Sequence, residues 1–241
     1  MKYLYDFHLH SCLSPCGDND MTPYNLVNMA KLLGYDIIAL TDHNSSQNCE
    51  AAINVGKEIG LTVVPGMELC TSEEAHIVCL FPDICSAMQF SDYVLSTMPE
   101  VKNRPQIFGD QLIMDSQDGV IGTQEKLLTI ASSISVSYVS DTVKQYGGIC
   151  YPAHIDRSSF SVISNLGMIT PDMNFSAVEL TEKGDRDEWK QNHPILNGAK
   201  FMSGSDAHYL ENMTEPIHAL ELPECTAESV IDYLKSLPLM K

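Results

Sequence analysis

Residues 3–10 read YLYDFHLH, an apolar run that ends on two histidines. A short apolar run rich in aromatic residues predicts a buried strand. Similar runs recur along the chain, and most are followed by a stretch of helical character. We expect further strands at residues 36–40, 61–65, 75–81, 148–152, 176–180, 200–203 and 217–222. We expect helices at residues 22–33, 46–59, 84–97, 124–146 and 227–237, with irregular structure over 99–122.

The alternation of apolar strands and helices indicates the fold class. Strands that are apolar throughout are typical of parallel βα units, in which helices cover the sheet on both sides. About seven such strands fit a closed or distorted barrel of the α/β class better than a sandwich. No repeat, low-complexity linker or clear boundary divides the sequence. We therefore expect a single domain over residues 1–241.

Composition and charge narrow the classes of function. The chain has 14 Lys and Arg against 32 Asp and Glu, a formal net charge of −18. Such a charge repels polyanions, so we expect a small substrate and disfavour a long nucleic acid. No apolar run is long enough for a membrane span, and the N-terminus lacks the apolar core of a signal peptide. We expect a cytoplasmic protein whose eight cysteines are free thiols; its oligomeric state is not predicted.

Six of the eight histidines lie at or beside the ends of expected strands, and carboxylates accompany them. In a barrel of parallel strands the carboxyl ends and the loops after them form one face, so residues far apart in sequence converge there. Imidazole and carboxylate ligands suit Zn²⁺, Mn²⁺ or iron rather than a metal selected by thiolates. The candidate metal ligands are His8, His10, His43, Glu68, His76, His154, Asp206 and His208.

These residues fall into motifs with a recognisable order. The motifs are HLH (8–10), TDH (41–43), GME (66–68), an isolated His76, PAH (152–154) and GSDAH (204–208). Their order and spacing resemble the PHP (polymerase and histidinol phosphatase) family over almost the whole chain, with the poorest match at about residues 84–146. The resemblance implies a distorted (β/α)7 barrel that holds up to three divalent ions.

The resemblance also implies how the ligands are shared among the ions. A first ion would be held by His8, His10, Glu68 and Asp206. Glu68 would bridge to a second ion, which His76 and His154 also hold. A third ion would take His43, His208 and an aspartate from the loop before Thr22-Pro23. Counting back along that loop gives Asp18, and Asp20 is the alternative because the loop is longer than the common form.

The implied reaction is hydrolysis of a phosphoester by a metal-activated hydroxide. Asp206, His208 and Glu68 would carry catalysis through the bound ions. Arg157 is the best candidate for gripping a phosphate bidentately, with a surface salt bridge as its alternative role. Arg104 and Arg186 are weaker candidates. Cys12 and Cys16 are interpreted as packing residues of the metal-side loop.

Three functions fit these residues. The first is a phosphoesterase acting on a small phosphorylated metabolite or nucleotide with two to three Zn²⁺, Mn²⁺ or iron ions. The second is a histidinol-phosphate phosphatase, and the third is a non-enzymatic metal-binding module that serves a partner protein. Segment 84–146 departs most from shorter relatives, so we expect it to cover or flank the cleft. Packing or a dimer contact is the alternative role of that segment.

Overall fold

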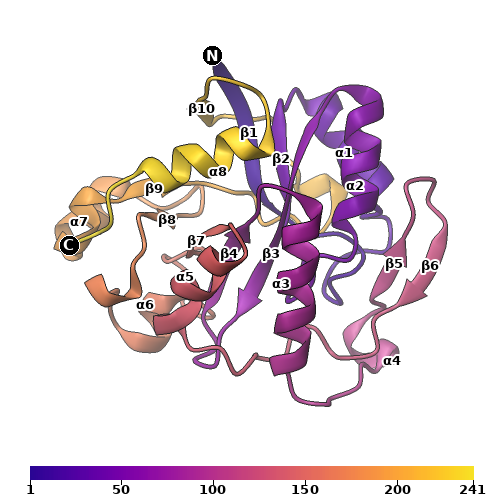
Figure 1. The fold of residues 1–241 in the computed structure, drawn as a ribbon, viewed down its shortest axis with the longest axis horizontal. Coiled ribbons are helices and arrows are strands. Elements are labelled where there is room, and N and C mark those ends of the chain that lie inside the picture. Colours follow the sequence, from indigo (N-terminus) through magenta and orange to yellow (C-terminus); the bar gives the residue numbers. More distant parts are fainter.

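A computed structural model describes all residues, 1–241, and Figure 1 shows their arrangement. Six strands form one curled sheet in the order β10-β1-β2-β3-β4-β7. Their bounds are β1 (Lys2–Leu9), β2 (Ile37–Leu40), β3 (Thr62–Cys70), β4 (His76–Leu80), β7 (Ile149–Pro152) and β10 (Ala219–Glu221). Two strands, β8 (Ala177–Glu179) and β9 (Lys200–Met202), pair in parallel with each other. A separate hairpin consists of β5 (Leu112–Met114) and β6 (Val120–Thr123).

The β8–β9 pair lies between the two ends of the curled sheet. On one side the backbone N–H of Ile155, just after β7, donates to the carbonyl of Glu179 in β8. On the other side the N–H of Asp206, after β9, donates to the carbonyl of His8 in β1. The sheet therefore curls round toward its own beginning, and the expected distorted barrel of the α/β class is confirmed.

Not every strand of the barrel is parallel. Strands β1, β2 and β3 run parallel, whereas β4 runs antiparallel to both β3 and β7. Consequently β3 and β4 are joined by a short hairpin instead of a helix. The amino end of β4 then lies at the same end of the barrel as the carboxyl ends of its neighbours.

Eight α-helices surround the strands. They are α1 (Pro23–Leu33), α2 (Cys49–Ile59), α3 (Ile84–Thr97), α4 (Pro105–Phe108), α5 (Val136–Gln145), α6 (Val162–Leu166), α7 (Arg186–Asn192) and α8 (Ala227–Ser236). The first helix begins and ends as its sequence predicts. The Thr22 hydroxyl accepts a hydrogen bond from the N–H of Asn25, and Gly34 ends the helix with a φ of 95°. No helix is long and apolar enough to cross a membrane, and the cytoplasmic location stays a prediction.

The long helix expected over 124–146 is wrong in its first half, because only α5 is helical there. Serines 132, 133 and 135 precede α5, and serine side chains compete with helical backbone bonds by forming local ones. The carboxylate of Glu73, in the β3–β4 hairpin, accepts from the hydroxyl of Ser135 and from the N–H of Val136. These contacts hold the first turn of α5 so that the helix begins at Val136. The segment expected to be irregular, 99–122, contains α4 and most of the β5–β6 hairpin.

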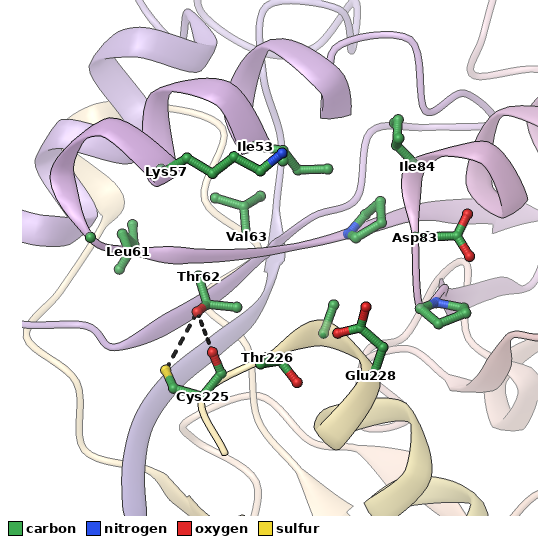
Figure 2. A pocket seen from close by; sticks show the side chains of 15 residues that line it. Ile53, Lys57, Leu61, Thr62, Val63, Asp83, Ile84, Cys225, Thr226 and Glu228 are labelled. Atoms are coloured by element: carbon green, nitrogen blue, oxygen red, sulfur yellow. Dashed lines mark hydrogen bonds between the residues drawn. The ribbon is translucent and has the colours of Figure 1, made fainter.

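A groove with a volume of about 560 Å³ lies over the first half of β3, between α2 and α8. Figure 2 shows Val63 and Thr62 on its floor, with Lys57 of α2 and Glu228 of α8 on its sides. It lies at the opposite end of β3 from Glu68 and contains none of the candidate metal ligands.

Candidate metal centre

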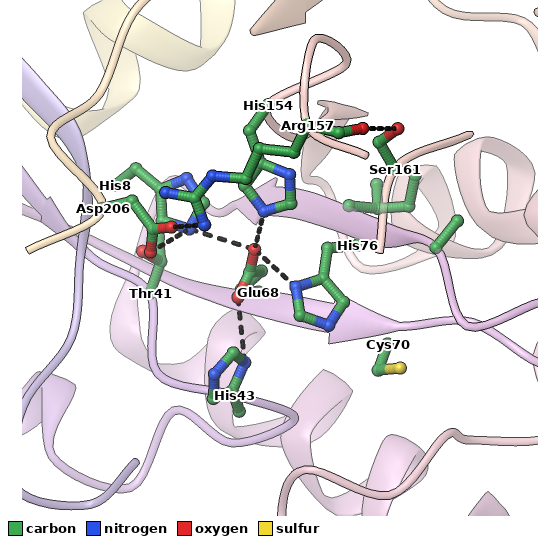
Figure 3. A network of polar contacts seen from close by, with 12 residues as sticks. His8, Thr41, His43, Glu68, Cys70, His76, His154, Arg157, Ser161 and Asp206 are labelled. Carbon is green, nitrogen blue, oxygen red and sulfur yellow. Dashed lines mark hydrogen bonds and ion pairs between the residues drawn. The ribbon is translucent and has the colours of Figure 1, made fainter. Parts of the chain in front are cut away.

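Glu68 lies at the centre of the predicted cluster. The residue is only 1% exposed, and its side chain projects from the second half of β3. Four imidazole nitrogens lie within 3.1 Å of its two carboxylate oxygens, as Figure 3 shows. They are His8 Nε2 at 3.1 Å, His43 Nδ1 at 2.9 Å, His76 Nδ1 at 2.9 Å and His154 Nε2 at 3.0 Å.

Asp206 approaches the same cluster from the loop after β9. Its Oδ1 lies 3.0 Å from His10 Nε2 and 3.4 Å from His8 Nε2. Its Oδ2 lies 2.6 Å from Nη1 of Arg157. The backbone of Asp206 has a φ of 51°, a left-handed conformation that non-glycine residues seldom adopt. Such strain persists where the surrounding structure holds it, and here it directs the carboxylate at the histidines.

The antiparallel direction of β4 explains how His76 joins the cluster. His76 is the first residue of β4, whereas His154 and Asp206 follow the ends of their strands. Because β4 is reversed, its first residue lies beside the last residues of β3. The N–H of His76 donates to the carbonyl of Phe160, whose ring stacks on the imidazole at a centroid distance of 4.9 Å.

Three groups of side chains offer ligand atoms that all lie within 4.8 Å of one another. They are His8, His10, Glu68 and Asp206; then His43, Glu68 and His76; then His10, His43 and His208. With His154, which contacts Glu68, the structure brings together eight of the nine predicted ligands. Asp18 is the exception. Its carboxylate accepts the N–H of Asp20 within the loop and belongs to none of the three groups.

The cluster fits divalent ions on its own chemistry. Several of its buried ligand atoms lie close to one another without forming a well-directed hydrogen bond: Nε2 of His8 and His10, Oε2 of Glu68 and Oδ1 of Asp206. Buried polar atoms without a partner cost free energy, and a coordinated cation removes that cost. Nitrogen and carboxylate oxygen donors of this kind suit Zn²⁺, Mn²⁺ or iron. The assignment of each residue as a ligand stays a prediction.

Electrostatic interactions keep the carboxylates ionised. Burial alone would raise the pKa of Glu68, but the imidazoles of His76, His8 and His43 outweigh it and hold the pKa well below its usual range. Burial likewise opposes ionisation of Asp206, and His8 and His10 more than compensate, so its pKa is also lowered. The site therefore presents two negative charges to whatever cation enters it.

Two buried carboxylates that sequence reasoning missed orient the first two histidines. Glu179, at the end of β8, lies 2.8 Å from Nδ1 of His8, so this nitrogen donates and Nε2 faces Glu68. For His10, Nδ1 lies 3.0 Å from the hydroxyl of Ser14, which in turn donates to Asp42. Carboxylates that fix the tautomer of a ligating histidine in this way are common around metal ions.

Sequence alone carried a signal for Glu179, since it lies at the carboxyl end of an expected strand, as do the motif residues. Asp42 was visible inside the TDH motif. Only the fold shows that these side chains point at histidine nitrogens.

The thiol of Cys16 differs from that of Cys12 in its electrostatic surroundings. Desolvation opposes its ionisation, but the charges of the His208 and His43 imidazoles outweigh it and lower the pKa of the thiol to about 6. Cys12, by contrast, is buried away from the histidines, and desolvation raises its pKa to about 12.

Of the three candidate arginines, only Arg157 lies at the cluster. It lines a cavity of about 420 Å³ that opens beside Asp206 and His154 and contains no hydrophobic residue. Lys183 lines the same cavity. Arg104 lies at the start of α4 with its guanidinium over the ring of Phe108, and Arg186 begins α7; neither lines the cavity.

The sequence matches the PHP domain over residues 6–160, which is more than half of its length. The chain belongs to the PHP domain family. The match confirms the resemblance seen in the motifs.

Two curated relatives align with part of this PHP protein. A 5′-3′ exoribonuclease from Haemophilus influenzae is 35% identical over 83 residues, which are 33% of this chain and 29% of the relative. An uncharacterised protein from Methanocaldococcus jannaschii is 33% identical over 84 residues, 32% of this chain and 48% of the relative. The alignments therefore span less than half of either curated relative.

Solved structures show the same fold at low identity. Endonuclease Q from Pyrococcus furiosus superposes with a TM-score of 0.71 at 15% identity, over 99% of this chain and 57% of that one. A proposed metal-dependent phosphoesterase from Bifidobacterium adolescentis superposes with a TM-score of 0.63 at 17% identity, over 95% and 94% of the chains.

One structure corrects the expectation about nucleic acids. Endonuclease Q in complex with a 27-mer duplex that carries an abasic lesion superposes with a TM-score of 0.72, at 14% identity, over 99% of this chain and 57% of that one. The expectation that disfavoured a long nucleic acid is therefore wrong, because this fold accommodates a duplex. Net charge failed as a criterion since it averages over the whole surface, whereas binding depends on the charges near the site, and divalent ions cancel carboxylates there.

Proposed function

We propose that this protein hydrolyses phosphoester bonds with two to three divalent ions held by the eight clustered residues. The observation that carries the proposal is the buried carboxylate of Glu68, which lies among four imidazoles beside a second buried carboxylate, Asp206. When bound, such ions lower the pKa of a water molecule and neutralise charge on phosphoryl oxygens. Zn²⁺, Mn²⁺ and iron all accept these ligands.

The protein's own side chains would place the phosphate. Arg157 reaches Asp206 from the wall of the cavity, and its side chain is 45% exposed. A guanidinium in this position can bind phosphate oxygens bidentately while its other edge stays near the metal ligands. Lys183 adds a second positive charge to the same wall. Carboxylates also line this cavity, so Arg157 and Lys183 are the groups in it that would attract an anionic substrate.

For the substrate, we propose a small phosphorylated metabolite or nucleotide. The cavity of about 420 Å³ beside the cluster is entirely polar and falls within the size range of small-molecule sites. Histidinol phosphate is the alternative within this class. A non-enzymatic metal-binding role stays the less favoured alternative, because the arginine and the cavity serve no evident purpose in it.

A second candidate is the end of a nucleic acid strand. Phe160 stacks on His76 and is 47% exposed, so it offers a ring face on which a base can stack at the rim of the cluster. The exoribonuclease relative acts, by its name, on such an end.

The test combines metal analysis with a substrate screen. Purified protein is loaded with Zn²⁺, Mn²⁺ or Fe²⁺ and assayed with mononucleotides, nucleoside bisphosphates, histidinol phosphate, an aryl phosphate and short RNA and DNA strands. We expect two to three ions per chain and hydrolysis that a chelator abolishes. Asp206→Asn should abolish turnover, whereas Glu182→Gln, an exposed carboxylate of the same cavity, should retain it. Turnover that survives Asp206→Asn contradicts the proposed site.

A further inference from the structure

The β5–β6 hairpin depends on bonds to the rest of the protein. A hairpin of two strands is marginally stable in water when it pairs with no further strand. In β6 the side chains of Val120 and Ile121 are exposed, so this strand packs little on the barrel. The position of the hairpin is therefore set by the contacts of its other strand, β5.

The buried side chain of Asn48 binds β5 through both ends of its amide. Its Oδ1 accepts the N–H of Met114 at 2.9 Å, and its Nδ2 donates to the carbonyl of Leu112 at 3.0 Å. The N–H of Leu112 in turn donates to the carbonyl of Cys12 at 3.0 Å. Because a backbone N–H only donates and a carbonyl only accepts, the strand fixes which end of the Asn48 amide is the oxygen.

The second hydrogen of Asn48 Nδ2 is directed at the loop that follows the HLH motif. It is donated to the hydroxyl of Ser11 at 2.9 Å. Ser11 donates its own hydroxyl hydrogen to Oδ2 of Asp42 at 2.6 Å and its backbone N–H to Oδ1 at 2.7 Å. All three residues are buried. Asn48 therefore sets the direction of the bonds that hold Asp42.

Asp42 is connected to two of the predicted ligands through Ser14. The Ser14 hydroxyl donates to Oδ1 of Asp42 at 2.7 Å, which uses its only hydrogen. Its oxygen then accepts from Nδ1 of His10 at 3.0 Å and from the backbone N–H of His43 at 3.1 Å. Nδ1 of His10 thus carries the hydrogen, and Nε2, which lies 3.0 Å from Asp206, is left as the ligand atom. A continuous path of hydrogen bonds joins the hairpin to the cluster.

We propose that Asn48 is a positioning residue of the metal centre, through which metal binding and the docking of the β5–β6 hairpin stabilise each other. An ion that fixes His10 and His43 also fixes the hydroxyls and the carboxylate that hold Asn48 against β5. Such a coupling is reciprocal: the factor by which the ion stabilises the docked hairpin equals the factor by which the docked hairpin tightens the ion. The inference rests on the proposed metal dependence and gives part of segment 84–146 a role in it.

Hydrogen exchange measures this coupling without any turnover. Amide exchange over residues 111–124 of the full-length protein is followed by mass spectrometry without metal and with saturating Zn²⁺. Competition with a chromogenic chelator gives the Zn²⁺ affinity. We expect Zn²⁺ to slow exchange in the hairpin by about fivefold or more, and Asn48→Ala to abolish the slowing and to lower Zn²⁺ affinity by a similar factor. Asn103→Ala is the matched control, since the Asn103 amide also donates to this segment, at the carbonyl of Gly109, but lies outside the path to His10; it should keep both.

The outcomes separate this inference from the proposed function. Zn²⁺ that binds without slowing hairpin exchange in the unmodified protein overturns the coupling and leaves the metal-dependent reaction intact. That measurement needs no variant, so it decides the matter even if Asn48→Ala does not fold. Slowing that survives in Asn48→Ala, or an equal loss of affinity in Asn103→Ala, overturns the role of Asn48. Failure to bind any Zn²⁺ overturns both the inference and the proposed function.

Discussion

Replacement of Glu179 by glutamine tests whether a buried carboxylate outside the ligand groups sets the affinity for metal. Glu179 lies 2.8 and 3.1 Å from Nδ1 of His8 through its two oxygens, and it accepts the backbone N–H of His154 at 3.1 Å. It thereby orients one predicted ligand through the ring and another through the backbone. Glutamine keeps the shape and one acceptor oxygen but removes the charge.

The expected magnitude follows from these contacts. Outer carboxylates of this kind are typically worth about 10–100-fold in metal affinity or activity. Because glutamine retains one acceptor, we expect Glu179→Gln to lower metal affinity by about tenfold, or about 1.4 kcal/mol. Glu179→Ala removes every contact, and we expect it to approach about 100-fold.

Competition with a chromogenic chelator measures the Zn²⁺ affinity of each variant directly. Asp156→Asn is the control, since the Asp156 carboxylate is also near this end of β8 but accepts only from the N–H and hydroxyl of Thr181. Wild-type affinity in Glu179→Gln, or an equal loss in Asp156→Asn, would refute the reasoning that Glu179 acts through His8.

Three further predictions concern binding and stability. Arg157→Ala should raise KM for a phosphorylated substrate by on the order of tenfold, since a hydrogen bond to a charged group is worth about 1.5–3 kcal/mol; an unchanged KM in steady-state kinetics would remove Arg157 from the phosphate site. Free Zn²⁺ at about 100 times its Kd should raise the free energy of unfolding by about 2.7 kcal/mol, which corresponds to roughly 5–11 °C in Tm by calorimetry. A chelator should reverse this shift. A Tm that does not change with added metal would contradict metal binding by the cluster. Asn44→Ala should lower the free energy of unfolding in urea by about 2–4 kcal/mol. The fully buried Asn44 amide donates to the carbonyls of Leu128 and Ile130, and its oxygen accepts the N–H of Cys70. A loss of stability below about 1 kcal/mol would show that other hydrogen bonds replace these three.

The part of the site that could be predicted from sequence is the part that local rules place. Apolar runs in the sequence indicated the strands β1, β2 and β3. Because parallel strands bring their carboxyl ends to one face, His8, His43 and Glu68 could be expected to lie together. The first helix was predictable to its ends, because Thr22 and Gly34 are specific signals for a start and a stop.

The remainder depends on contacts between distant segments. The reversal of β4, which brings His76 to the cluster from the start of its strand, has no signature in the residues of β4 themselves. The late start of α5 depends on Glu73, more than sixty residues earlier. The loop that contains Asp18 is held beside the cluster by the bond from the Asp18 N–H to the carbonyl of His208, which joins segments nearly two hundred residues apart.

The spread of the cluster along the chain has a consequence for how the protein matures. Its members run from His8 to His208, so nearly two hundred residues separate the first from the last. During synthesis the early histidines emerge long before Asp206 and His208, which close the cluster. Contacts between residues so far apart in sequence form late in folding, because closing the long intervening loop costs conformational entropy. The two groups of potential ligands that include Asp206 or His208 are therefore completed only by roughly the last seventh of the chain, and a chain released before residue 206 lacks both groups however well its first half is folded.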